Sequence, residues 1–295
     1  MKQDKIKKDN PPEKFFKGDD LKMATAIYKN DIQTIDNLVK QEHFNVNGRG
    51  SARIEGDTVC YTYLNYAVAV GSLNASEELL KLGADVNLLA DNGGWYEANI
   101  NAACSNKNKK MIELLIKYKE NLNPKFCHSP ITDLLMGEVD KSLIDLLLSN
   151  GADINYQTYI GGGVAVSTAL NINEFDYVNY FLDKGANPSI IEYSGSSLAL
   201  EIQSEIAEGR LSGYKLKEYT KLKERLVNQF HVKFPLKLEY RKGQEACIRR
   251  YDDLSQSDKD FLGKAEADRI RLYRDNLVKG VNILGQSIDS FENAK

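Results

Sequence analysis

The side chains with the most obvious catalytic or metal-binding chemistry are three histidines and four cysteines. The histidines, His43, His128 and His231, fall in three separate segments and form no HExxH motif. The cysteines form no CxxC pair and no Cys/His spacing of a zinc site, and the chain has no GxSxG nucleophile elbow. The sequence therefore predicts no enzyme, no metal site and no bound cofactor.

Two local arrangements could still suggest chemistry. Cys127 and His128 are neighbours, as a nucleophile and its base could be, but adjacent residues in an extended hairpin point to opposite faces. Gly161-Gly162-Gly163 could cradle a phosphate, yet it lacks the Lys-Ser/Thr and the helix start that such a loop needs, so a hairpin turn is expected. Cys60, Cys104, Cys127 and Cys247 are few and unevenly spaced, which leaves their redox state open; Cys104 falls at a position expected to be buried.

A five-residue phrase recurs through the chain, each time after a Leu-rich helical pattern. It reads Gly83-Ala84-Asp85-Val86-Asn87 and Gly151-Ala152-Asp153-Ile154-Asn155, with a partial copy at Gly185-Ala186-Asn187. Glycine can close a helix in the left-handed conformation, and the following Asp or Asn can tie a turn with its side chain. The last residue of the phrase or its equivalent falls at Asn47, Asn87, Asn123, Asn155 and Ser189, at intervals of 40, 36, 32 and 34 residues.

These intervals and motifs resemble those of ankyrin-repeat proteins, whose period is about 33 residues. The second copy, from Thr62 to Asn87, matches the ankyrin pattern without a gap, and the fourth runs from Ser129-Pro130-Ile131 to Asn155. The other copies are less regular. The resemblance implies an all-α chain with short β-hairpins, an ankyrin-repeat solenoid of five to six repeats with a helical C-terminal cap. We expect a disordered tether over residues 1–17, the solenoid over 18–230 and the cap over 231–295.

The ends of the chain each allow two interpretations. The Lys-rich stretch up to Pro11-Pro12 is typical of a disordered N-terminus. It is either the start of a cytoplasmic protein or the spacer of a periplasmic lipoprotein whose leader was removed. In the C-terminal segment, Ser257 and Asp260 resemble a capping box, followed by an apolar stripe. The stripe comprises Ile270, Tyr273, Leu277, Val281 and Leu284. It predicts a helix that caps the last repeat; a partner-binding amphipathic helix is the alternative.

Composition favours a protein partner over nucleic acid or membrane. The net charge is −3 and the isoelectric point is near 5.8, so no global basic field attracts nucleic acid or anionic lipid. No apolar run approaches the length of a membrane span. We expect a chain that is monomeric before it forms a complex with another protein.

The expected hairpin tips carry aromatic and arginine side chains, the residue types that dominate interface hot spots. Ankyrin hairpins usually line the partner-binding face, so these residues form the predicted contact surface. Tyr63 and Ile191 are expected to pack between hairpins, whereas Trp95 and Tyr159 are expected at the surface. The predicted partner-binding residues are Arg49, Arg53, Tyr61, Asn92, Trp95, Tyr96, Tyr156, Thr158, Tyr159 and Tyr193.

The opening from Pro12 to Asp31, with Phe15-Phe16-Lys17-Gly18, is similar to the start of bacterial ankyrin proteins encoded beside secreted antibacterial lipases. In that group, the ankyrin protein serves as the immunity protein of a type VI secretion phospholipase. The resemblance implies that this chain binds and neutralises such a toxin in the periplasm. A generic cytoplasmic scaffold is the second hypothesis, and a regulatory module of an enzyme is the third.

Overall fold

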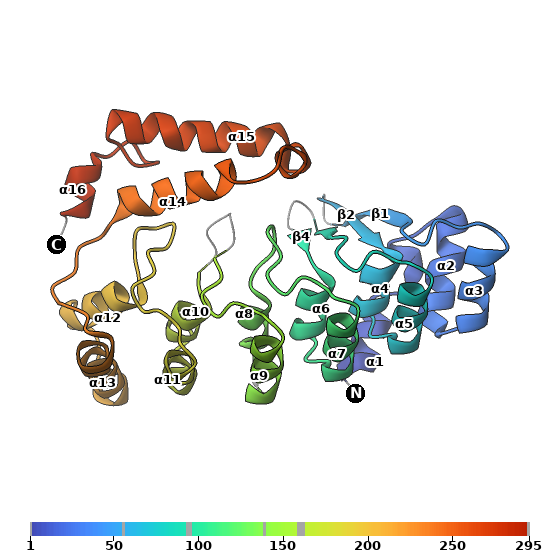
Figure 1. Cartoon of the computed structure of the whole chain (residues 1–295), viewed down its shortest axis with the longest axis horizontal. Coiled ribbons are helices and arrows are strands. Elements are labelled where there is room, and N and C mark those ends of the chain that lie inside the picture. The colour runs from blue at the N-terminus through green and yellow to red at the C-terminus, as the bar shows by residue number, and fades with distance from the viewer. Residues whose placement is uncertain (1, 55–56, 93–95, 138–139, 158–162, 294–295) are drawn as a thin grey trace. The chain divides into compact units, whose positions relative to one another are not determined.

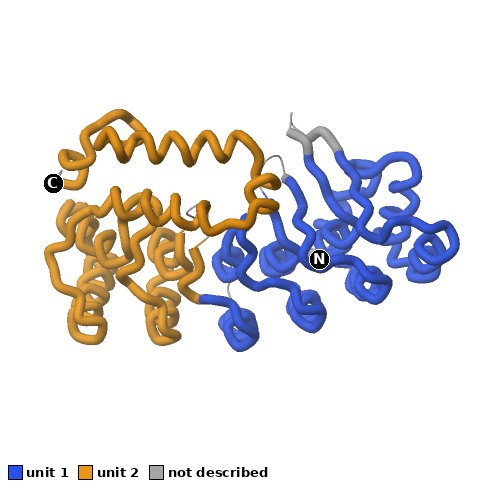
Figure 2. Tube along the Cα trace, turned by 45° about the horizontal axis from the view of Figure 1, so that its top comes forward, with its two compact units in different colours: residues 1–153 blue, residues 154–295 orange. Residues whose placement is uncertain are grey.

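The computed structural model describes residues 2–54, 57–92, 96–137, 140–157 and 163–293. The chain divides into two compact units, residues 1–153 and 154–295 (Figure 2). Each unit consists of short antiparallel helix pairs followed by loops or strands (Figure 1). The predicted sites at Trp95, Thr158 and Tyr159, and the glycines at 161 and 162, lie outside the described residues.

Four helix pairs are described in unit 1. They are α2 (Gly18–Lys29) with α3 (Ile32–Lys40), α4 (Tyr63–Ala69) with α5 (Leu73–Lys81), α6 (Asn99–Ser105) with α7 (Lys109–Lys117), and α8 (Pro130–Leu134) with α9 (Lys141–Ser149). Unit 2 adds two described pairs, α10 (Ala165–Asn171) with α11 (Phe175–Asp183) and α12 (Leu198–Ala207) with α13 (Gly213–Phe230). The six described pairs agree with the five to six repeats expected from the sequence.

Burial along the second helices explains why they fold only in a stack. Leu79 on α5, Leu115 on α7 and Leu147 on α9 are completely buried, although each helix has only nine residues. Helices this short are marginal in isolation, so their stability comes from the apolar face packed against a neighbour. Gly83, Gly151 and Gly185 follow these helices with φ of 95°, 101° and 95°, the left-handed conformation expected for the recurring phrase.

Asparagine side chains join consecutive repeats at the recurring phrase. The Oδ1 atom of each asparagine accepts a hydrogen bond from the main-chain N–H two residues before the equivalent position of the next repeat. In unit 1 the pairs are Asn47 with Asp85, Asn87 with Asn121 and Asn123 with Asp153, each at 2.8 Å. In unit 2 Asn155 accepts from Asn187 at the same distance. The phrase therefore links repeats as well as ending helices.

Four strands of unit 1 form one antiparallel sheet in the order β1-β2-β3-β4. They are β1 (Arg49–Ile54), β2 (Asp57–Thr62), β3 (Ala90–Asn92) and β4 (Tyr96–Glu97). Two successive hairpins thus share one sheet, which we call the finger sheet. Thr62 ends β2 and opens α4 with a capping box, its side chain and that of Asn65 each accepting from the other's main-chain N–H.

The residues before α2 pack on the first repeats, in contrast to the expected disordered tether over residues 1–17. They form α1 (Lys2–Asp9) and the short helix η1 (Pro12–Lys14). Phe16 is only 1% exposed and contacts the ring of Tyr66 at a centroid distance of 5.1 Å, while Phe15 contacts Tyr61 at the same distance. The apolar pair at 15 and 16 outweighs the polar composition around it, because both rings have partners in the second repeat.

The C-terminal segment forms three helices, α14 (Tyr240–Asp252), α15 (Gln256–Lys279) and α16 (Ile288–Glu292). Its first residues contact the last helix pair, where the Gln203 side chain exchanges two hydrogen bonds with the main chain of Leu236. Helix α14 instead lies along the loop between α11 and α12, and α15 packs on α14 (Figure 1). The expected end cap is thus mainly a cover over a loop of unit 2.

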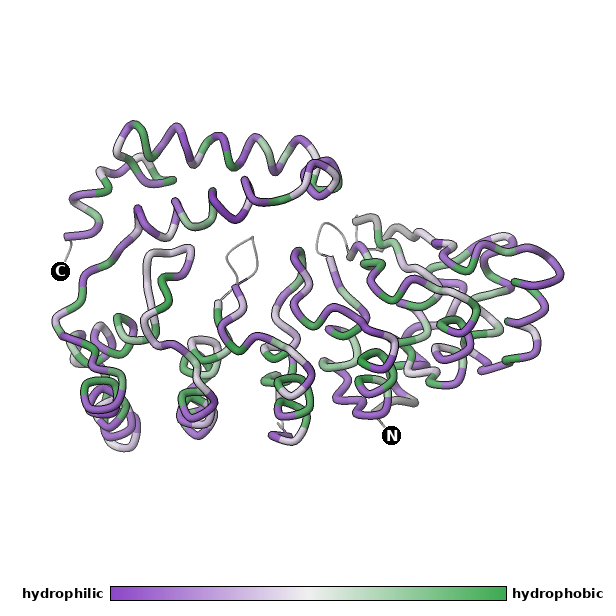
Figure 3. Tube along the Cα trace, in the orientation of Figure 1, coloured by the Kyte–Doolittle hydropathy of each residue, from purple (hydrophilic) through white to green (hydrophobic). Residues whose placement is uncertain are grey.

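Details of α15 differ from the sequence prediction. Its capping box is formed by Ser255 and Asp258, not by Ser257 and Asp260, and Gly263 interrupts the helix with φ of 76°. Hydrophobic and hydrophilic residues alternate along it (Figure 3). Ile270 and Tyr273 are buried. The predicted stripe does not reach Leu284, which is 75% exposed beyond the end of the helix. No helix within the described ranges is long and apolar enough to span a membrane.

Candidate protein-interaction surface

The residues with potential catalytic chemistry are dispersed or buried. His43 and His231 adopt the left-handed conformation, with φ of 58° and 55°, and His231 ends α13. Both histidines therefore have structural roles in turns. Cys127 is buried, and burial raises the pKa of its thiol to about 12, so it is not a ready nucleophile. All four cysteines are free thiols, and Cys104 is completely buried as expected. The described residues contain no group of His, Cys, Asp or Glu that could hold a metal ion.

The finger sheet has an inner and an outer face, set by its register. One row across the four strands is Gly50, Tyr61, Ala90 and Glu97, and the next is Ser51, Cys60, Asp91 and Tyr96. Gly50 and Ala90 are buried, whereas Ser51 is exposed. Side chains alternate between faces along a strand, so the row with Ser51 lies on the outer face. Arg49 is at the same parity as Ser51 and is also exposed.

This register places the predicted partner-binding residues on both faces. Arg49 and Tyr96 lie on the outer face. Tyr61 lies on the inner face, where its ring packs edge-on against Phe15. In the register, Asn92 of β3 pairs with Val59, and Arg53 of β1 pairs with Thr58. Tyr63, expected to be internal, is 1% exposed and stacks on Phe16.

Three outer-face residues were not predicted from the sequence: Ser51, Cys60 and Asp91. Cys60 and Asp91 are half-buried between their cross-strand neighbours. Burial, and secondarily the Asp91 carboxylate, raise the pKa of Tyr96, which agrees with their pairing across β3 and β4. Arg49 makes no ion pair with any described residue. The outer face thus combines a cation, an anion, a hydroxyl, a thiol and an aromatic ring, a mixed surface suited to protein contacts.

In unit 2 the corresponding loop surface is already in contact with the C-terminal helices. Tyr193 donates from its hydroxyl to that of Tyr273 at 2.7 Å, and its main-chain oxygen accepts from the Gln244 amide at 3.0 Å. Arg250 donates to the Gln157 side chain at 2.8 Å, next to the half-buried Tyr156. Tyr193, predicted as a partner-binding residue, therefore takes part in an intramolecular contact.

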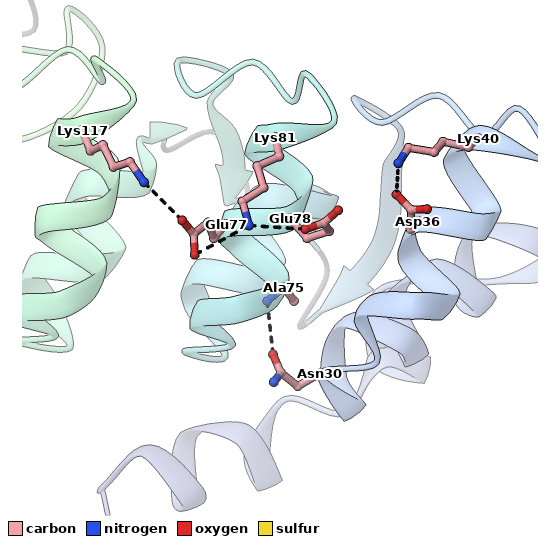
Figure 4. Close-up of polar contacts among 8 residues, drawn as sticks. All are labelled: Asn30, Asp36, Lys40, Ala75, Glu77, Glu78, Lys81 and Lys117. Carbon is pink, nitrogen blue, oxygen red and sulfur yellow. Dashed lines mark hydrogen bonds and ion pairs between the residues drawn. The ribbon is translucent and has the colours of Figure 1, made fainter.

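The second helices of unit 1 carry charges that pair with one another (Figure 4). Lys117 on α7 contacts Glu77 on α5 at 3.2 Å, and Lys81 lies 3.6 Å from Glu78. Lys40 pairs with Asp36 along α3 at 2.5 Å. Exposed pairs of this kind contribute little to stability, typically less than about 1 kcal/mol. The lysines of this helix surface thus have acidic partners on the same surface, whereas Arg49 on the finger sheet makes no ion pair with a described residue.

Three acidic side chains of unit 1 are removed from water to different degrees: Glu120 is buried, and Glu97 and Asp133 are half-buried. Burial, with a smaller contribution from Asp133, raises the pKa of Glu97 to about 7. Burial also raises the pKa of Asp133 to about 6, although Asn101 donates to it at 2.6 Å. Glu120 accepts from the Ile100 N–H at 2.7 Å, yet burial holds its pKa well above the ordinary value. The raised pKa values mean that ionisation of these groups bears on the stability of unit 1.

Comparison with known proteins identifies the fold. No protein-family model matches the chain, and no curated protein matches it. Among solved structures, the chain is similar to the ankyrin repeat domain of Bcl-3, a member of the IkappaB protein family, with a TM-score of 0.56 and 20% sequence identity. The match covers 71% of this chain and 87% of that one. The predicted ankyrin-repeat fold is thereby confirmed, and at this identity the likeness concerns the fold alone.

Proposed function

We propose that this chain is a protein-binding ankyrin module and that the outer face of the finger sheet is its contact surface. The ankyrin-repeat fold is typically a non-catalytic interaction scaffold. The observation that carries the choice of surface is the exposure of Arg49 and Ser51, together with the half-buried Tyr96, on one sheet face. The loop surface of unit 2 is less suited to this role, because the C-terminal helices contact it through Tyr193.

We further propose that the partner is a secreted antibacterial phospholipase and that the chain is its immunity protein. This proposal is supported by the resemblance of residues 12–31 to immunity proteins of type VI secretion lipases. A phospholipase toxin acts at the bacterial envelope, so the periplasm is the proposed compartment, with a lipid anchor in the precursor. Fractionation of the native strain tests the compartment, because an immunity protein of this kind should be absent from the cytoplasmic fraction.

Capture of the partner tests the function. The purified chain is immobilised and incubated with lysate from its native strain, and the captured protein is identified and assayed on phospholipid vesicles. The proposal expects a lipase whose activity is lost on addition of a stoichiometric amount of the chain. A captured lipase that stays fully active, or a captured protein without toxic activity, would contradict the immunity role. The latter result would favour the generic scaffold.

Matched variants test the surface. Arg49→Ala should weaken binding to the captured partner by roughly 2 kcal/mol if it is a hot-spot residue. Lys117→Ala is the control, because it removes a similar positive charge from the self-paired helix surface. Equal affinities of both variants would move the contact away from the finger sheet. Trp95→Ala tests the corresponding prediction made from the sequence.

A further inference from the structure

Strand β1 ends the finger sheet and leaves one edge of main-chain groups without a strand beside it. The sheet order places β2 on one side of β1, and the described residues provide no strand on the other. The main-chain oxygen of Gly48 accepts from the Tyr63 N–H at 3.2 Å, so residues 48 and 63 form a hydrogen-bonded pair. Hydrogen-bonded and non-hydrogen-bonded pairs alternate along an antiparallel ladder. Residues 49, 51 and 53 therefore belong to non-hydrogen-bonded pairs and direct their N–H and C=O groups away from β2.

The edge is preformed. A Cβ atom built at Gly50 would lie 2.2 Å from the ring of Phe16 and 2.7 Å from the main-chain oxygen of Phe15, so the strand is held directly against the N-terminal segment. All six residues of β1 stay in register with β2, without a bulge or a proline. A regular, rigid edge lowers the conformational cost of adding another strand.

The charges of β1 select the kind of strand that fits. Arg49 is exposed, and position 53, also arginine, has the same parity in the register. If a second copy paired with β1 antiparallel about Ser51, each position 49 would face a position 53, and like charges directly opposite are destabilising. Carboxylates four residues apart on an extended segment would instead lie opposite positions 49 and 53, both of which are arginine in the sequence.

From this geometry we propose that the open edge of β1 accepts an extended acidic segment of the partner protein, which adds a fifth strand to the finger sheet. The proposal rests on the protein-binding function proposed above and specifies its mode. Main-chain hydrogen bonds at residues 49, 51 and 53 provide the attachment, and the arginines provide the preference for acidic sequence.

A synthetic peptide tests the edge without knowledge of the natural partner. The probe is the terminally blocked peptide Thr-Glu-Val-Thr-Val-Glu-Thr, titrated at low millimolar concentration into the isotope-labelled full chain and followed by NMR. The main-chain amides of residues 49, 51 and 53 should shift. The same peptide with lysine in place of glutamate should bind more weakly, and Arg49→Glu should abolish this preference because one cation and one anion would then lie on the edge.

Ser51→Pro provides the matched variant. It removes an N–H that points away from β2, so the β1–β2 pairing and the melting temperature should be retained, as for proline on edge strands. Peptide affinity should fall about tenfold or more, because a hydrogen bond is lost and the ring blocks the edge. Ser51→Ala keeps the N–H and should stay within about twofold of the parent.

Three results would overturn the proposal: no shifts at residues 49–53, equal peptide affinity of Ser51→Pro and Ser51→Ala, or self-association of the chain through this edge. If Ser51→Pro does not fold, the effect of Arg49→Glu on the preference for the acidic peptide decides instead. Failure here is distinct from failure of the proposed function. A natural partner that is captured but binds Ser51→Pro normally would leave the function intact and remove only the added strand.

Discussion

The substitution Phe16→Ala tests whether the N-terminal segment is part of the folded array. Phe16 is 1% exposed, with ring centroids 5.1 Å from Tyr66 and 5.9 Å from Tyr63. Its ring also fills the space in front of Gly50, where a Cβ would lie only 2.2 Å away. The side chain therefore joins the segment before α2 to the second repeat and to the edge strand of the finger sheet.

The expected loss of stability combines three contributions. Burial of a phenylalanine side chain contributes about 1.5–3 kcal/mol. Each of the two ring pairs adds about 0.5–1.5 kcal/mol beyond burial. A cavity would remain because Gly50 has no side chain to fill it. The burial and ring contributions add up to about 2.5–6 kcal/mol, which brackets the roughly 3–5 kcal/mol typical of buried Phe→Ala substitutions.

Hydrogen exchange with mass spectrometry is the suitable assay, since repeats can unfold separately and a single melting temperature would hide the effect. Phe16→Ala should accelerate exchange in α2, β1 and α4 while α10 and α11 stay unchanged. Lys8→Ala, at an exposed position of α1, is the control. If Phe16→Ala exchanges like the parent throughout residues 18–69, the segment before α2 is not part of the folded core.

Three further predictions concern the repeats and the buried acids. Leu79→Ala and Leu147→Ala should each cost about 2–5 kcal/mol in urea unfolding, whereas Leu148→Ala, at a half-buried position, should cost less; equal losses at 147 and 148 would contradict the repeat register. Asn87→Ala should cost about 1 kcal/mol through loss of its hydrogen bond to Asn121, and Asn87→Asp, which keeps an acceptor, should cost less. The raised pKa of Glu97, about 7 against an ordinary 4.5, means that the folded protein binds more protons than the unfolded chain between these values. The free energy of unfolding should therefore fall as pH rises through this window, and Glu97→Gln should stabilise the protein on the order of 2 kcal/mol at pH 8 but not at pH 4. An equal effect at both pH values would exclude ionisation as the cause.

The repeat architecture could be predicted because its signals are local. Each recurring phrase needs a left-handed glycine after a helix and an asparagine at a fixed distance, and Gly83, Gly151 and Asn87 all take these roles. The third repeat replaces the phrase by Lys119-Glu120-Asn121 and still folds in the same way. Lys119 adopts φ of 66°, and Glu120 is buried where other repeats have alanine. Neighbouring repeats impose this conformation on a sequence that does not itself specify it.

The candidate surface could be predicted only in part, because faces of a sheet depend on register. Tyr61 and Tyr96 are similar residues at similar hairpin positions, yet Tyr61 faces Phe15 and Tyr96 faces outward beside Asp91. A shift of one residue would exchange the two faces. Pairing between β2 and β3 joins segments about 30 residues apart, and no local pattern reveals it. Ser51 and Asp91 were missed for this reason.

The role of the C-terminal helices also depends on contacts that composition does not show. A Cβ atom at Gly195 would lie 2.3 Å from the main-chain nitrogen of Tyr240, and one at Gly243 would lie 2.3 Å from the main-chain oxygen of Glu192. The loop before α12 and helix α14 therefore meet backbone to backbone, with a glycine on each side. An amphipathic helix that binds a separate partner does not need such complementary glycines on its own chain. This close fit favours a cover of the unit 2 loop over a helix that binds a separate partner, which supports our proposal that the finger sheet of unit 1 is the recognition surface.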